Sequence, residues 1–172
     1  MKLKEWFDRT EGHWLSERRY IFNSRPSMMT SRIYTGPLEE ERVSLIPDTF
    51  NADLFLKFKW TTTHYDTLKE VSGGEMLVGV NTTDHTIYRS VGYMTDKPTI
   101  TNVTMVDDDT VVLITEYDNQ QFREEIRLLH NDTVRLRQTV GFSGDRVTVV
   151  GQYYETRTDD YDVQQDSNPI LQ

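Results

Sequence analysis

The sequence predicts an all-β protein, a closed antiparallel barrel of about ten strands that follows a short N-terminal helix. Three observations lead to this fold. Apolar and polar residues alternate with period two from Trp14 to Arg157, the alternating segments are rich in Val, Ile, Thr, Tyr and Phe, and short turn sequences separate them. A meander of this kind removes its exposed edges by closing into a barrel, and such a barrel can hold one small ligand.

The N-terminal residues 1–13 have a helical pattern. Leu3, Trp6 and Phe7 fall at positions i, i+3 and i+4, so they share one face of a helix. Gly12 is a typical helix-terminating residue, and we expect the helix to stop there.

The period changes to two at Trp14, which shares a strand face with Arg18 and Phe22. Clusters of Gly, Asn, Asp and Ser, such as residues 72–74 (Ser-Gly-Gly), are expected to form turns between the strands. Further strand candidates are residues 29–35, 41–46, 53–62, 75–82, 86–94, 99–106, 110–117, 120–129, 133–141 and 146–157.

The chain of 172 residues is long enough for one domain that buries a core or surrounds a ligand cavity. We expect residues 1–157 to form a single ligand-binding β-barrel domain. Residues 158–172 are polar and show no apolar period, so we expect them to be a mobile tail.

Composition excludes several classes of function. The formal net charge of −9 argues against a nucleic-acid partner, because phosphate-binding surfaces need clustered Lys and Arg. The chain has no cysteine, which excludes disulfides, thiolate metal ligands and cysteine nucleophiles, and its four histidines are too far apart to predict a metal site. No segment resembles a signal peptide or a membrane span, so a cytoplasmic protein with no membrane partner is expected.

Charged residues occupy strand faces that otherwise look internal. Glu124 lies on the same face as Phe122 and Ile126, and Arg18 lies on the aromatic face that includes Tyr20. A carboxylate on an apolar face is costly unless it is paired or meets a donor from a ligand.

The last two strands repeat this pattern. Glu155 and Arg157 continue the face of Tyr153, while Arg135 and Arg137 share a face one strand earlier. Together these residues favour a site for a ligand that carries both carboxylates and N–H donors.

Two interpretations of these charges remain open. One is a set of internal salt bridges, for example between Arg18 and Glu124 or Glu155. The other is a ligand site, because arginine matches carboxylates in bidentate geometry, and a glutamate can accept from ring N–H groups. Desolvation should also raise the pKa of Glu124 and make it a usable acid.

Three segments resemble the S-type phycobiliprotein lyases of the CpcS/CpeS family. Residues 12–18 (Gly-His-Trp-Leu-Ser-Glu-Arg) are similar to the opening Gly-x-Trp-x-Ser-x-Arg of that family, and residues 155–157 (Glu-Thr-Arg) resemble its closing Ser-Glu-Ile-Arg. The intervening similarity covers residues 113–117, 124–128, Asn131 and 135–137. These segments follow the family's order and spacing from about residue 5 to residue 157.

The resemblance implies a lipocalin-like or fatty-acid-binding-protein-like barrel. Such proteins bind a phycobilin, which is a linear tetrapyrrole, and attach it through a thioether bond to a cysteine of a phycobiliprotein subunit. The expected partners are therefore a bilin, with phycoerythrobilin favoured, and an apo subunit of phycoerythrin or phycocyanin. The bilin is the substrate and no further cofactor is expected; a homodimer is left open, and the implied host is a cyanobacterial or phage-infected cell.

The resemblance and the strand faces together give the candidate site. Glu124 and Glu155 are the expected catalytic residues, which would protonate the conjugated system as the acceptor thiolate adds. The expected ligand-binding residues are Trp14, Arg18, Tyr20, Trp60, Arg135, Arg137, Tyr153 and Arg157.

The chain departs from the family pattern at Arg19 and Ile21, near positions where threonine and histidine often stand, and at Arg127, in place of an aromatic residue. A histidine-held bilin is therefore not expected, and the pocket wall should differ. Two alternatives to a lyase are a non-catalytic lipocalin-like carrier of a bilin or similar apolar acid, and an interaction module with a filled barrel.

Overall fold

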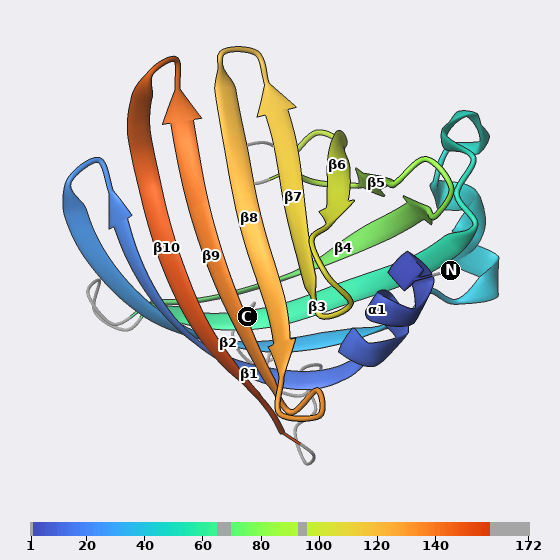
Figure 1. Ribbon diagram of the computed structural model, residues 1–172, viewed down its shortest axis with the longest axis horizontal. Coiled ribbons are helices and arrows are strands. Elements are labelled where there is room, and N and C mark those ends of the chain that lie inside the picture. The colour runs from blue at the N-terminus through green and yellow to red at the C-terminus, as the bar shows by residue number, and fades with distance from the viewer. Residues whose placement is uncertain (1, 65–69, 93–95, 159–172) are drawn as a thin grey trace.

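Ten antiparallel strands form the predicted closed barrel. The computed structural model describes residues 2–64, 70–92 and 96–158, and in it the sheet closes in the order β1-β10-β9-β8-β7-β6-β5-β4-β3-β2 (Figure 1). The period-two alternation places one set of side chains inside the closed sheet and the other set on its outer wall. The strands are β1 Gly12–Phe22, β2 Arg25–Pro37, β3 Leu54–His64, β4 Glu70–Asn81, β5 Thr86–Arg89, β6 Thr99–Met105, β7 Thr110–Tyr117, β8 Gln120–Leu129, β9 Val134–Ser143 and β10 Arg146–Arg157.

The N-terminal helix α1 covers Lys2–Thr10, so it is shorter than the expected range 1–13. It ends before Gly12, whose φ of +120° belongs to a region that side chains rarely adopt. Trp6 and Phe7 are buried, as the helical period predicts. The expected tail at 158–172 lies outside the described residues except for its first residue.

The strand expected at 41–46 is wrong, because the structure has short 3-10 helices there. Val43 and Ile46 stand three residues apart, which is a helical spacing, and Pro47 cannot donate a hydrogen bond to a neighbouring strand. Ile46 packs in a small apolar cluster separate from the main core. The two helices are η1 Glu40–Leu45 and η2 Asp48–Phe50.

Residues 72–74 (Ser-Gly-Gly) belong to β4 and do not form the expected turn. Gly74 lies opposite Trp60 of β3, and a Cβ atom at Gly74 would come within 2.5 Å of the indole ring. The glycine therefore leaves room for the Trp60 ring to lie against the neighbouring strand.

β1 closes the barrel, because it pairs with β2 on one side and with β10 on the other. In the second pairing Trp14 lies opposite Arg157 and Phe22 lies opposite Val149. Turns alternate between the two ends of an antiparallel barrel. Helix α1 therefore lies at the same end as the β6–β7 and β8–β9 turns (the helix end), and the β1–β2, β7–β8 and β9–β10 turns lie at the other (the hairpin end) (Figure 1).

The main apolar core joins α1 to the inner faces of the strands. Leu3, Trp6 and Phe7 pack in one cluster with Trp14 and with residues from most of the strands. No helix in the described part of the chain is long and apolar enough to cross a bilayer.

Candidate functional site

A cavity of about 320 Å³ lies inside the barrel. Such a volume is at the lower end of the range for small-ligand sites, which is about 300–1,000 Å³. Residues from α1 and from eight strands or their ends surround it. They are Trp6, Phe7, Thr10, Arg18, Ile33, Phe58, Trp60, Thr62, Met76, Val78, Ile87, Arg89, Val91, Gly92, Leu113, Glu124, Ile126, Arg135 and Arg137.

One wall of the cavity is aromatic and apolar. Phe58, Trp60 and Met76 come from β3 and β4, while Trp6 and Phe7 project from α1 and cover the helix end. Trp60 was predicted as a ligand-binding residue, and the structure places it on this wall. An extended conjugated ligand could pack its rings here.

The opposite wall carries a buried carboxylate between two arginines. Glu124 is 1% exposed, and its Oε1 lies 3.3 Å from Nη2 of Arg89 on β5. Its Oε2 accepts a hydrogen bond of 2.8 Å from Nη2 of Arg137 on β9. Both oxygens of Glu124 are therefore engaged by cations, and Glu124 is not an isolated acid.

A second buried carboxylate lies next to the first. Glu155 on β10 is 0% exposed, and its Oε1 accepts a 2.6 Å hydrogen bond from Nε of Arg135. Its Oε2 lies 3.7 Å from Nη1 of Arg137 and 3.9 Å from Nη2 of Arg18. Arg137 thus contacts both carboxylates and connects the two pairs.

These contacts determine the charge of Glu155. Burial alone raises the pKa of this carboxyl group, but the three arginines Arg135, Arg137 and Arg18 outweigh it and lower the pKa to about 2. Glu155 is therefore ionised at neutral pH, so the expectation that it supplies a proton does not fit its surroundings.

The arginines respond in opposite directions. Burial lowers the pKa of Arg135, and Glu155 only partly compensates for it. Burial also acts on Arg137, but the charges of Glu155 and Glu124 outweigh it and raise the pKa of that guanidinium. Within the described residues, Nε of Arg137 is buried without a hydrogen-bond partner, which leaves one donor for a ligand.

Tyr153 and Tyr20 lie beside this cluster. The rings of the two tyrosines are 5.2 Å apart, and the guanidinium groups of Arg18 and Arg137 lie 4.9 Å and 5.2 Å from the centre of the Tyr153 ring. Burial raises the pKa of the Tyr153 hydroxyl, which donates a hydrogen bond to Oγ1 of Thr139. Neither tyrosine lines the cavity, so both support the arginines from behind.

Trp14 and Arg157 also do not line the cavity. Trp14 is fully buried, its Nε1 donates to the carbonyl oxygen of Thr10, and the guanidinium groups of Arg135 and Arg157 lie over its ring at 4.4 Å. Although both face inward as predicted, they lie near the helix end, where α1 covers them.

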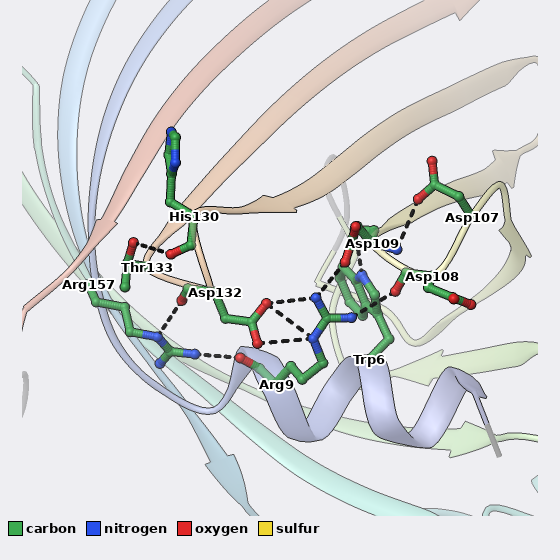
Figure 2. A network of polar contacts seen from close by, with 9 residues as sticks. All are labelled: Trp6, Arg9, Asp107, Asp108, Asp109, His130, Asp132, Thr133 and Arg157. Carbon is green, nitrogen blue, oxygen red and sulfur yellow. Dashed lines mark hydrogen bonds and ion pairs between the residues drawn. The ribbon is translucent and has the colours of Figure 1, made fainter.

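Arg157 instead belongs to a network that fastens α1 to the barrel (Figure 2). Its guanidinium donates to the carbonyl oxygens of Arg9 and Glu11, just where α1 ends, and at 2.6 Å to that of Asp132. These carbonyl groups at a helix C-terminus have no partner within the helix, so a cation stabilises them.

Arg9 makes the second half of this network. Its Nη2 donates to Asp132 at 2.7 Å and to Asp109 at 2.6 Å, and its Nη1 donates to the carbonyl oxygen of Asp108 (Figure 2). Trp6 adds a hydrogen bond of 2.9 Å from Nε1 to the carbonyl oxygen of Asp109. The helix that closes one end of the cavity is thus held by the β6–β7 and β8–β9 turns.

Sequence reasoning missed Arg89 and the contribution of α1. Arg89 is 6% exposed and pairs with Glu124, but a single arginine at the end of a short strand gave no pattern to single it out. The burial of Trp6 and Phe7 was predicted, whereas their position over the barrel end depends on tertiary contacts. Among the described residues, no group of three His, Cys, Asp or Glu side chains is placed to hold a metal ion.

A closed barrel with a charged internal cavity is the architecture of a small-ligand-binding protein. The chain belongs to the CpeS-like family, because the family model described as "CpeS-like protein" matches residues 2–158.

Individual relatives agree with this assignment. The chain is 29% identical over 163 residues to a putative chromophore lyase, CpcV, of Picosynechococcus sp., covering 88% of this chain and 79% of the relative. It is 28% identical over 166 residues to a putative phycocyanobilin lyase, CpcS 2, of Nostoc sp., covering 91% of each chain. The S-type phycobiliprotein lyase CPES from Guillardia theta has the same fold, with a TM-score of 0.78 and 22% identity over 94% of this chain and 95% of that one.

Proposed function

We propose that this protein, a chromophore lyase by its family and relatives, holds a phycobilin in the barrel cavity and attaches it to a phycobiliprotein subunit. The bond formed is a thioether to a cysteine of the apo subunit. The phycobilin that we expect is phycoerythrobilin, and phycocyanobilin, which the name of the Nostoc relative specifies for that protein, is the competitor to test.

The observation that carries this proposal is the charge of the buried cluster. The two glutamates Glu124 and Glu155 are contacted by four arginines, which are Arg18, Arg89, Arg135 and Arg137. Among the described residues the cluster therefore has two more cations than anions, in a place where burying charge is costly. A bilin carries two propionate groups, and two carboxylates would balance this excess.

The internal salt bridges that formed the alternative interpretation are present, and they support the ligand site. They hold the guanidinium groups in place before the ligand arrives, which reduces the entropy lost on binding. The free Nε of Arg137 and the partly exposed Arg18 are the donors that we assign to the propionates.

The cavity is smaller than a whole bilin, and this determines which part of the bilin the acceptor can reach. Four conjugated rings exceed the space next to the charged cluster, so one end of a bilin held by its propionates would project towards the hairpin end. The acceptor thiol can then reach that end without opening the barrel. Holding both reactants in one geometry supplies the catalysis, since the chain has no cysteine of its own.

Thioether formation is an addition. The acceptor thiolate forms a carbon–sulfur bond to the ethylidene group of the terminal ring, and the proton lost from the thiol is returned to the conjugated system, so no oxidant or reductant is required. Glu124 remains our candidate for handling that proton, because it lines the cavity and can exchange partners with Arg89 or Arg137 when the propionates bind.

Absorption spectroscopy tests the proposal directly. The purified protein is mixed with phycoerythrobilin or phycocyanobilin, and with the dimethyl ester of each. Binding should shift the absorption of the free acids and should weaken at least about tenfold for the esters, which cannot pair with arginine. Equal binding of acid and ester would contradict the role of the arginine cluster.

Transfer separates a lyase from a carrier. The loaded protein is incubated with apo subunits of phycoerythrin and phycocyanin, and the mixture is denatured. Colour that stays on the acceptor shows the thioether, while binding without transfer to any subunit would leave a carrier. The matched control is Arg123→Ala, which removes an exposed arginine from the outer wall of the same strand as Glu124 and should leave both steps unchanged.

A further inference from the structure

Inward-facing hydroxyl groups form a row across three neighbouring strands. The strand register pairs Ser16 of β1 with Ser31 of β2, and Ser31 with Thr62 of β3. These three residues are buried, at 0%, 0% and 6% exposure. Burying a hydroxyl group is costly unless it is hydrogen-bonded, so the partners of the three hydroxyls determine what each of them can do.

The row divides between the charged cluster and the cavity. Oγ of Ser16 accepts a hydrogen bond of 2.9 Å from Nε of Arg18, so this hydroxyl belongs to the charged cluster. Ser31 and Thr62 are hydrogen-bonded to each other through their hydroxyl groups. Thr62 lines the cavity, with Ser31 behind it on the neighbouring strand, and therefore presents the pair to a ligand.

The Ser31–Thr62 pair keeps hydrogen-bonding capacity for such a ligand. Each hydroxyl has one hydrogen to donate and two lone pairs, and the bond between them uses one of each. Among the described residues neither hydroxyl makes a further hydrogen bond, so the pair still has one hydrogen to donate. Thr10, the other hydroxyl residue on the described cavity wall, donates instead to the carbonyl oxygen of Phe7 within α1.

Thr62 stands on the aromatic wall of the cavity. Phe58 and Trp60 precede it at inward-facing positions of β3. Arg18 on β1 and Arg89 on β5 are each two strands away, which is about 10 Å between backbones. A ligand carboxylate pairs more strongly with these arginines than with a hydroxyl, so the ligand group that suits Thr62 is a neutral hydrogen-bond acceptor.

Thr62 also lies deeper in the barrel than the arginines assigned to the propionates. The strand pairing forms one row from Arg137 through β10 to Arg18, and through β2 to His64. Thr62 stands two residues before His64, which is about 7 Å nearer the helix end along β3. A ligand group at Thr62 is therefore on the side of these arginines that faces away from the hairpin end.

We propose that Thr62, positioned by Ser31, is the subsite for a terminal lactam ring of the bilin. This proposal rests on the proposed function. A bilin carries its propionates on the two central rings, and each terminal ring is a lactam, a neutral amide with a carbonyl acceptor. The Thr62 hydroxyl donates to the lactam carbonyl of the ring inside the barrel. Arg18 and Arg137 hold the propionates, and the other terminal ring projects towards the hairpin end.

A purely structural role is the competing explanation, because a hydroxyl pair also bridges strands elsewhere in the barrel. Thr101 and Thr115 form such a pair between β6 and β7, at 2.6 Å and with 0% and 1% exposure. Neither is among the described residues that line the cavity. Loss of this pair removes a similar bond from the fold without removing a ligand contact, so it provides the control.

The test compares Thr62→Val with Thr115→Val in the full-length protein. Both substitutions keep the shape of the side chain and remove one hydroxyl from a buried pair that joins two strands. A third variant, Thr62→Ser, keeps the hydroxyl. Affinity is measured by absorption titration with phycoerythrobilin and with phycocyanobilin, both of which have terminal lactams. Infrared difference spectra of loaded against empty protein give the stretching frequencies of the lactam carbonyls.

We expect Thr62→Val to bind both bilins about tenfold more weakly. The stretching frequency of one lactam carbonyl should rise, because a hydrogen bond to a carbonyl lowers that frequency. Thr62→Ser and Thr115→Val should bind within about twofold of the unchanged protein, with the frequency unaltered. Equal losses of affinity in Thr62→Val and Thr115→Val would overturn the proposal, and so would a loss in Thr62→Val without a frequency shift.

Transfer to apo subunits, measured on the same samples, separates this proposal from the proposed function. If the unchanged protein transfers bilin and Thr62→Val binds it equally well, the lactam subsite fails and the lyase function stands. If binding depends on Thr62 but the unchanged protein transfers bilin to no subunit, the subsite stands and the lyase function fails. An unchanged protein that binds neither bilin would overturn both.

Discussion

At the scale of single residues, the buried charges of this barrel differ in what they can do. Glu155 is held by three arginines and keeps its negative charge, so its role is to fix the positions of Arg135 and Arg137. Glu124 faces the cavity and shares Arg137 with Glu155. Only Glu124 can therefore both change partners and reach the ligand.

Replacing Glu124 with glutamine should separate binding from transfer. Gln keeps the shape but has no carboxylate to exchange a proton with the bilin, and it releases Arg89 and Arg137 for the ligand carboxylates. Bilin affinity should stay within about threefold, while transfer at saturating bilin should fall by about 10²-fold, the lower range for a lost general acid. Absorption titration and the rate of thioether formation measure the two quantities.

Glu116→Gln is the matched control, because Glu116 is an exposed carboxylate on β7, the strand next to β8, and accepts a hydrogen bond from Gln121. It should change neither quantity. Parallel losses of affinity and transfer in Glu124→Gln would indicate a purely structural carboxylate.

The lowered pKa of Glu155 should appear in the stability of the protein against pH. Its pKa is about 2 in the folded state and 4.5 in the unfolded reference, so its contribution is complete above about pH 4.5 and is lost as the pH falls towards 2. The shift corresponds to about 3 kcal/mol. The difference in free energy of unfolding between the unchanged protein and Glu155→Gln should shrink as the pH falls through this window, as measured by urea denaturation at several pH values.

The control is Glu41→Gln, which changes an exposed carboxylate on η1 and should show no such dependence on pH. A difference for Glu155→Gln that stays constant with pH would exclude the proposed linkage.

At the scale of elements, α1 is a lid that the barrel holds by polar contacts at its C-terminal half and by apolar contacts at Trp6 and Phe7. Its hydrogen bonds go to two turns that are more than 90 residues away in sequence. α1 can therefore make all of its contacts with the barrel only when these two turns are folded.

Arg9→Ala should loosen α1 without opening the strands. The substitution removes the hydrogen bonds from Arg9 to Asp109 and Asp132. The hydrogen bonds with Arg9 are also the main cause of the lowered pKa of Asp132. Their loss should lower the free energy of unfolding by about 1–3 kcal/mol. Amide hydrogen exchange of Lys2–Thr10 should become faster while exchange in β8 and β9 stays the same. Lys4→Ala, which removes an exposed pair with Asp8, is the control and should have little effect. Unchanged exchange in Arg9→Ala would mean that the apolar contacts hold the helix alone.

The sequence predicted the strands where alternation was clear and failed where other constraints dominate. The segment 41–46 was read as a strand although its apolar spacing is helical, and the strand expected at 86–94 ends already at Arg89. Residues 72–74 look like a turn, yet they lie in β4 because Gly74 makes room for Trp60. Glycine in a strand and glycine in a turn look the same in one sequence.

The sequence predicted which residues of the candidate site face inward, but not which of them line the cavity. Strand parity correctly placed Arg18, Glu124, Arg135, Arg137 and Glu155 on inner faces, and the structure brings them into contact. The period-two alternation of a strand determines whether a side chain faces the inside or the outside of the barrel. It does not determine how far along the barrel axis that side chain lies. For this reason Trp14 and Arg157, which share the inner face, lie under α1 and outside the cavity.

At the scale of the whole molecule, a barrel with an internal cavity has fewer packing contacts in its core than a filled barrel, because part of the interior is reserved for the ligand. The buried cluster of charges adds to this cost, because each ion has been removed from water. Ligand binding should therefore stabilise the fold.

Saturating bilin should raise the melting temperature. At a free bilin concentration of about 100 times the Kd, linkage adds about 2.7 kcal/mol to the free energy of unfolding. For a chain of this size that is a rise of about 5–10 °C, measurable by scanning calorimetry. The dimethyl ester at the same concentration should give a much smaller rise; equal rises would show that the propionates do not contribute.

The pairing of the first strand with the last has a consequence for synthesis. As the chain leaves the ribosome, β1 can pair with β2 at once. Its other edge has no partner until β10 emerges, because Trp14 pairs with Arg157 and Phe22 pairs with Val149. The same arginine also binds the carbonyl groups at the end of α1, so the first helix cannot dock fully before the last strand is made. The nascent chain therefore carries two unpaired strand edges and an uncovered aromatic interior until β10 has been made, and over this interval it is most prone to aggregate.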